Sequence, residues 1–174
     1  MKIKTFWMSS LALLAMLLTV GSPTAAVEHR LGLGVHAWKP AGELLDDFSV
    51  DDERDLAGVL SYQLVVLNPL KLEVDLEYFP NGFGGAGEEA WAPQALVVLG
   101  DRWYAAAGAG WVYSRELAGD FSPTIYIARL GVDLPILPRL RLDVSADERA
   151  ADLDQLTEFD EDTITFAAVL RFQL

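Results

Sequence analysis

An alternation of apolar and polar residues with a period of two runs through the chain from residue 27 onward. In KLEVDLEYFP, residues 71–80, the even positions from Leu72 to Tyr78 are apolar or aromatic and the odd positions from Lys71 to Glu77 are charged. The segments 140–149 and 163–174 repeat this split. Because successive side chains of a β-strand point to opposite faces, the pattern predicts strands with one apolar and one polar face.

The alternation predicts eight strands, each near the ~10 residues that a tilted strand needs to cross a bilayer. They are expected at 29–39, 55–67, 71–80, 91–99, 102–113, 123–134, 140–149 and 163–174. Short turns at 68–70, 100–101 and 135–139 alternate with longer segments at about 40–54, 81–90, 114–122 and 150–162. This predicts an up-and-down sheet with short turns at one rim and long loops at the other.

The first residues have the composition of a secretory signal peptide. Lys2 and Lys4 precede an apolar run that is too short to span a bilayer, and small residues follow up to Ala26. We therefore expect two parts, a signal peptide over 1–26 and one barrel domain over 27–174. Loss of both lysines changes the formal net charge from −13 to about −15, which argues against nucleic acid as a partner. The chain has no cysteine, so an exported domain must be stable without disulfides.

These features resemble the small eight-stranded outer-membrane barrels, the OmpX type and the OmpA-like transmembrane domain. The resemblance covers residues 27–174 and rests on strand number, loop alternation and face pattern. It implies an all-β fold, an eight-stranded antiparallel up-and-down transmembrane β-barrel after a cleaved N-terminal signal peptide. It also implies a monomer in the outer membrane of a Gram-negative bacterium, with outer-membrane lipid, lipopolysaccharide and the β-barrel assembly machinery as partners and with no cofactor.

In such a barrel one strand face meets lipid and the other lines the lumen. The alternation predicts a charge network in the lumen formed by Glu73, Asp75, Glu77, Arg129, Asp133, Arg141, Asp143, Arg149 and Arg171. Aromatic residues near the strand ends are expected to form girdles at the two membrane interfaces: Trp38, Tyr78, Trp91, Trp103, Trp111, Tyr113 and Phe172.

Three further patterns carry little chemistry. GFGGAG, residues 82–87, has glycine spacing like that of a dinucleotide site but precedes EEAWAP rather than a helix, so a hairpin tip is expected. The acidic stretches at 43–53 and 152–162 offer oxygen ligands for divalent cations, although a solvated acidic rim is the plainer interpretation. His29 and His36 fall on opposite faces of one strand, so neither catalytic residues nor metal ligands are predicted.

The leading functional hypothesis is a non-enzymatic integral outer-membrane barrel whose acidic extracellular loops serve a structural, surface-contact or adhesion role. Two alternatives stay open at this point. One is an outer-membrane enzyme that modifies lipid A through His36. The other is a soluble periplasmic lipocalin-like barrel, which would place the charged faces outward and bind an apolar ligand inside.

Overall fold

Strands form where the alternation predicts them. The structure is a computed structural model that describes residues 27–38, 56–81, 83, 88–114, 121–152 and 164–174. Within these residues it contains β1 (Glu28–Ala37), β2 (Leu56–Leu67), β3 (Leu70–Phe79), β4 (Ala90–Gly100), β5 (Trp103–Gly110), β6 (Tyr113–Ser114), β7 (Ile125–Leu137), β8 (Leu140–Ala150) and β9 (Thr165–Gln173). No helix among the described residues is long and apolar enough to cross a membrane.

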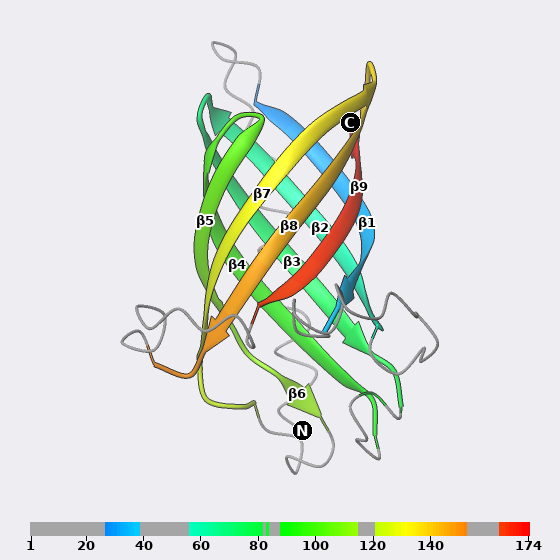
Figure 1. The fold of residues 1–174 in the computed structure, drawn as a ribbon, viewed down its shortest axis with the longest axis vertical. Coiled ribbons are helices and arrows are strands. Elements are labelled where there is room, and N and C mark those ends of the chain that lie inside the picture. The colour runs from blue at the N-terminus through cyan, green and yellow to red at the C-terminus, as the bar shows by residue number, and fades with distance from the viewer. Residues whose placement is uncertain (1–26, 39–55, 82, 84–87, 115–120, 153–163) are drawn as a thin grey trace, which may run out of the picture.

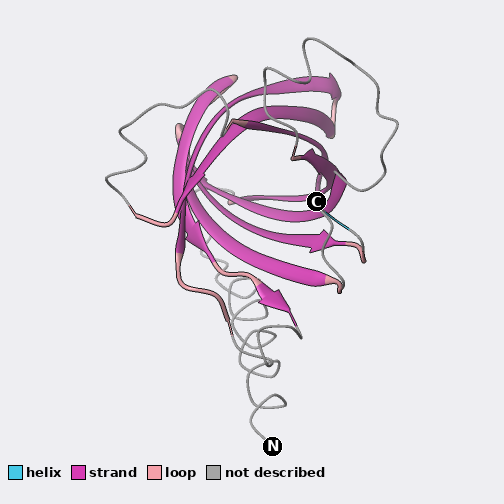
Figure 2. Cartoon of the chain, turned by 60° about the horizontal axis from the view of Figure 1, so that its bottom comes forward, coloured by secondary structure: helices cyan, strands magenta, loops and turns pink. Residues whose placement is uncertain are grey.

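The long strands close into a ring. Each pairs antiparallel with its neighbours along the chain, β7 follows β5 in the ring, and β1 pairs with β9 to complete it (Figure 1). Figure 2 shows the ring from one end, with its strands wrapped around a central axis. The chain is therefore a closed eight-stranded antiparallel up-and-down β-barrel, as the sequence predicted. The signal peptide predicted over 1–26 lies outside the described residues.

The strands are strongly tilted, and the pairing register gives the reason. When paired residues are followed from strand to strand around the ring, starting at Leu70 of β3, the path returns to β3 about 10 residues further along that strand. The circuit passes through Leu99, Ala105, Leu130, Ala146, Phe166, Ala37 and Leu56. A closed sheet with this stagger must tilt its strands, as Figure 1 shows, and eight strands enclose a lumen only wide enough for side chains.

The connections define two rims. The short-turn rim holds the turns at 68–69, 101–102 and 138–139 together with the start of β1 and the end of β9. The opposite long-loop rim holds the ends joined by the longer connections, and the acidic stretches expected there, 43–53 and 152–162, lie almost wholly outside the described residues.

Two strands differ from their predicted bounds by more than two residues at one end. The single strand expected at 102–113 is divided into β5 and β6, opposite Pro93 of β4. Proline has no N–H to donate to the ladder, so regular pairing is interrupted there. In contrast, β7 continues through Pro135 to Leu137 with a register irregularity, where a turn was expected. This extends the β7–β8 hairpin beyond the end of β5.

Apolar side chains cover the outside of the barrel and polar side chains fill the inside. Leu33, Leu130 and Trp103 are 70%, 66% and 75% exposed, whereas the inward Glu73, Asp147 and Arg171 are almost completely buried. The charged faces therefore point inward, which was one of the two arrangements that periodicity left open. The lipocalin-like alternative required an apolar lumen and does not fit this arrangement.

The seam between β1 and β9 depends on a close approach at Gly34. A Cβ atom at this position would overlap the carbonyl oxygen of Ala168 and the backbone of Val169. We expect Gly34→Ala to lower the free energy of unfolding by about 1–3 kcal/mol, because the strands of the seam must move apart. Gly58→Ala is the matched control, since nothing lies within 4 Å of its added Cβ. Urea unfolding of the refolded barrel measures both, and equal stability of the two variants would contradict the seam argument.

Candidate functional site

Among the residues that the structure describes, the charge network of the lumen contains six basic and six acidic side chains, which come from β1, β3, β7, β8 and β9. They are Arg30, Lys71, Arg129, Arg141, Arg149, Arg171, Glu73, Asp75, Glu77, Asp133, Asp143 and Asp147. All nine residues predicted for the lumen charge network are among them. Because isolated buried charges are very costly, their arrangement must provide partners for each.

Arg129 on β7 is the centre of this network. Its guanidinium makes two hydrogen bonds of 2.8 Å to the carboxylate of Asp147 on β8. One of its nitrogens also lies 2.7 Å from Glu73 and 3.0 Å from Asp75, both on β3 across the lumen. One cation thus neutralises carboxylates from opposite walls, and fork-shaped guanidinium geometry suits this role.

Arg171 on β9 completes the middle layer. It lies 2.8 Å from Glu73 and 2.8 Å from Asp143. The hydroxyl of Tyr104 on β5 donates to Asp143 at 2.8 Å, and the Gln63 amide donates to Glu73 at 2.6 Å. The middle of the lumen is therefore filled by a continuous network of charge-assisted hydrogen bonds.

Asp133 on β7 is surrounded by cations near the short-turn rim. Arg141 lies 2.7 Å from it, Arg30 2.9 Å and Lys71 3.7 Å. Of the three lumen charges outside the predicted nine, Lys71 and Asp147 alternate with predicted residues of β3 and β8, whereas nothing was predicted for Arg30. Arg30 has the same parity on β1 as His36, which is buried in the lumen, so the period-two alternation could have placed it there.

The long-loop end of the lumen has a different composition. Glu77 accepts two hydrogen bonds from Arg149, at 2.6 and 3.1 Å, and lies 2.8 Å from Nδ1 of His36. Nε2 of His36 lies 2.8 Å from the Thr165 hydroxyl on β9. This contact could not be predicted, because Thr165 and His36 are far apart in the chain and meet only at the closing seam between β1 and β9.

The order hydroxyl, imidazole, carboxylate is the one found in nucleophilic catalysis. Here, however, His36 is completely buried and Thr165 is nearly so, and the Thr165 hydroxyl also lies 3.2 Å from the backbone oxygen of Asp147. The contacts are those of a filled interior in which the hydroxyl, the imidazole and the carboxylate each have a partner. No group of three or more ligand side chains within the described ranges is placed to hold a metal ion.

The expected aromatic girdles are placed on the outside with one exception. Trp103 and Phe172 are exposed near the short-turn rim, and Trp91 and Trp111 are exposed near the long-loop rim. Tyr78 packs on Trp91 at a centroid distance of 4.5 Å, and Tyr113 on Phe121 at 5.4 Å.

Trp38 is the exception, because its ring lies on the lumen side. It packs against Phe79 and Phe83, with centroids 5.5 and 6.1 Å away, and under the guanidinium of Arg149 at 4.6 Å. Its parity with His36, an inward residue, is the physical reason. Trp38 therefore covers the long-loop end of the charge network rather than joining a girdle.

Comparison with known proteins gives little beyond this fold. No family model matches the sequence, and no curated protein matches it. Among solved structures the chain is similar to the crystal structure of Neisserial surface protein A (NspA), with a TM-score of 0.44 and 11% sequence identity over 85% of this chain and 96% of that chain. The fold assignment rests on the strand pairing itself, and membership of the OmpX type or the OmpA-like group stays a prediction.

The central position of Arg129 leads to a stability prediction. Arg129→Met leaves the carboxylates of Glu73, Asp75 and Asp147 short of their shared cation, so we expect the free energy of unfolding to fall by about 3–5 kcal/mol. Arg139→Met is the matched control, because Arg139 is exposed on the β7–β8 turn and its loss should change stability by less than about 0.5 kcal/mol. Urea unfolding followed by tryptophan fluorescence measures both. If Arg129→Met unfolded at the same urea concentration as the wild type, the ion pairs of Arg129 would add no stability.

Proposed function

We propose that the protein is an integral outer-membrane barrel without enzymatic activity, with a structural or surface-contact role for its long acidic loops. This proposal rests on the distribution of side chains, which is the reverse of that in a water-soluble protein. Apolar residues occupy outward positions around the ring, including Leu33, Val97, Leu130 and Leu170, while paired charges fill the lumen. In hydrocarbon every backbone polar group must be paired within the protein, and a closed ring meets that requirement.

The orientation proposed for the barrel follows from its two rims. Short turns and both ends of the ring are at one rim and longer connections at the other, which is the arrangement with periplasmic turns and extracellular loops. The acidic stretches at 43–53 and 152–162 would then face the cell exterior, where lipopolysaccharide and divalent cations are the proposed contacts.

A channel or catalytic role has less support. Eight strands enclose a lumen that side chains fill, and here charged pairs and the Trp38 cluster occupy it. His36 faces this interior rather than lipid, so the arrangement favours a structural role for its contacts with Glu77 and Thr165 over lipid A modification.

The membrane proposal predicts that substitutions on the outer surface depend on depth. The wild-type chain, produced in a Gram-negative host, should fractionate with the outer membrane and migrate differently on SDS gels before and after boiling. Leu33→Arg places a charge near mid-strand on the lipid side and should lower the free energy of unfolding in lipid vesicles by about 2–4 kcal/mol. Leu137→Arg places it at the short-turn rim, where the expected loss is about 0–1 kcal/mol.

These two leucines are a matched pair, since both are largely exposed, at 70% and 60%. A soluble barrel would tolerate both arginines equally and would appear in the periplasmic fraction. That pair of results would contradict the membrane proposal.

The contact role predicts that the loops are accessible from outside the cell. Protease added to intact cells should cleave within 43–53 or 152–162, because these stretches join strands at the proposed extracellular rim. Cleavage can be mapped by mass spectrometry of the released peptides, with a periplasmic protein as the control for cell integrity. Complete protection in intact cells, with cleavage after permeabilisation, would reverse the proposed orientation and remove the surface role.

A further inference from the structure

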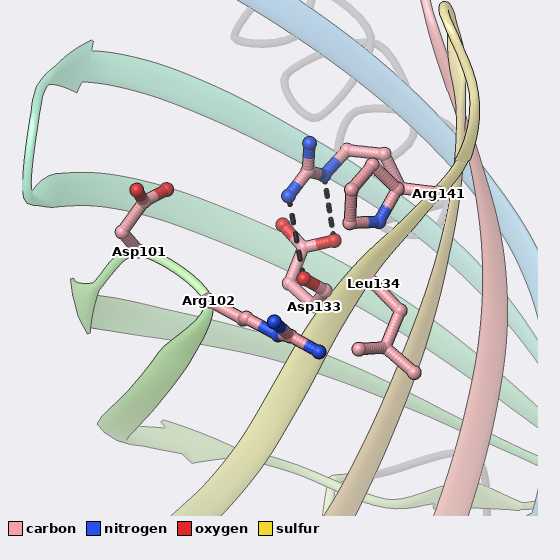
Figure 3. A pocket seen from close by; sticks show the side chains of 6 residues that line it. Asp101, Arg102, Asp133, Leu134 and Arg141 are labelled. Atoms are coloured by element: carbon pink, nitrogen blue, oxygen red, sulfur yellow. Dashed lines mark hydrogen bonds and ion pairs between the residues drawn. The ribbon is translucent and has the colours of Figure 1, made fainter.

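The short-turn rim contains a notch that the proposed function does not use. It lies between the β4–β5 turn and the longer β7–β8 hairpin, with a volume of about 400 Å³, and is lined by Asp101, Arg102, Asp133, Leu134, Pro135 and Arg141. The notch exists because β7 continues beyond its last pairing with β5, at Val132, as far as Leu137. Figure 3 shows Asp133 with Arg141 and Arg102 nearby.

The three cations Arg30, Lys71 and Arg141 in and below the notch outnumber the two carboxylates that pair with them, Asp133 and Glu28. The buried carboxylate of Asp133 is contacted by Arg141, Arg30 and Lys71, so its charge is already neutralised. The Lys71 ammonium lies 3.7 Å from Asp133, donates a hydrogen bond of 3.3 Å to the backbone oxygen of Asp101 and lies over the ring of Tyr104, 5.7 Å from its centroid. The cluster therefore has unused capacity to bind an anion.

Arg102 adds a further cation at the edge of the notch. Its side chain is exposed and makes no hydrogen bond or ion pair with the part of the chain that the structure describes. Asp101, which also lines the notch, offsets one charge. The backbone oxygen of Arg102 accepts a hydrogen bond of 2.8 Å from the Asp133 amide, which fixes this turn beside β7.

The charges of the lumen are also unevenly distributed along its axis. The third near the short-turn rim has Arg30, Lys71 and Arg141 against Asp133 and Glu28, which pairs with Arg30. The remainder has three arginines against five carboxylates, Glu73, Asp75, Glu77, Asp143 and Asp147. In a chain with a formal net charge of −13, this concentration of cations at one rim is an exception. Low-dielectric walls focus such a field at an opening and favour an anion there.

We propose that this notch binds a phosphate-type oxyanion between the guanidinium groups of Arg102 and Arg141, with Lys71 adding charge from below. Planar guanidinium groups match the oxygens of phosphate and bind them in a bidentate manner. The group comes from free phosphate or from a phospholipid headgroup, which share this chemistry. The site requires no membrane location, so it goes beyond the proposed function and is tested separately.

The test uses the full barrel domain refolded in a maltoside detergent, which contains no phosphate. Inorganic phosphate is titrated and binding is measured by calorimetry and by ³¹P line broadening. We expect saturable binding that Arg102→Gln weakens by at least about tenfold, because a charge-assisted pair is lost. Arg139→Gln removes the same charge from the adjacent β7–β8 turn, outside the notch, and should change the affinity by less than about twofold.

Equal weakening by the two variants would show diffuse attraction to the rim, and an absence of saturable binding by wild type would show no site; either result overturns the proposal. A second titration with short-chain phosphatidylglycerol distinguishes the sources. Displacement of phosphate at much lower lipid concentration identifies a headgroup site, and failure to displace it identifies a site for the free anion. The boiling-dependent gel shift of the same samples reports folding, so a failed titration is separable from a failed barrel.

Discussion

Closure of the sheet between β1 and β9 is the constraint on which the rest of the structure depends. Without this pairing both strands would leave a row of N–H and C=O groups unpaired, open to pairing with other chains. In the proposed membrane location, hydrocarbon would not tolerate such an edge. Closure with eight strands and the observed stagger sets the width of the lumen. Because the lumen is narrow, side chains from opposite walls contact one another, as Arg129 of β7 does with Glu73 and Asp75 of β3.

The narrow lumen explains why charge can be buried here. A carboxylate or guanidinium removed from water needs close partners, and each wall supplies them for the other. Small inward residues make room for the long side chains, as at Gly32, where an added Cβ would meet Val169 and Arg171. Outside the ring the same strands present leucine, valine and aromatic side chains, so one alternating sequence satisfies two environments.

Much of this architecture could be predicted from period-two alternation. Strand number, antiparallel order and the separation of charged from apolar positions on β3 and β8 depend only on neighbouring residues in sequence. Alternation alone does not decide which face is inside, because exchanging the two faces leaves the pattern unchanged; the placement of the charged face in the lumen was predicted from the resemblance to outer-membrane barrels. The contact between Thr165 and His36 also could not be predicted from the sequence, since it depends on the register of the pairing between β1 and β9. Trp38 was misplaced because its position near a strand end outweighed its parity with His36.

The ion pairs of the lumen mostly join strands that are distant in the chain, and this has a consequence for assembly. Glu73 and Asp75 of β3 receive their cations from β7 and β9, and Glu77 from β8. A partial sheet ending at β4 would therefore carry uncompensated carboxylates on one face. In the proposed membrane location, insertion and completion of the ring would then be coupled, because the last strands supply the charges that make the first ones compatible with lipid.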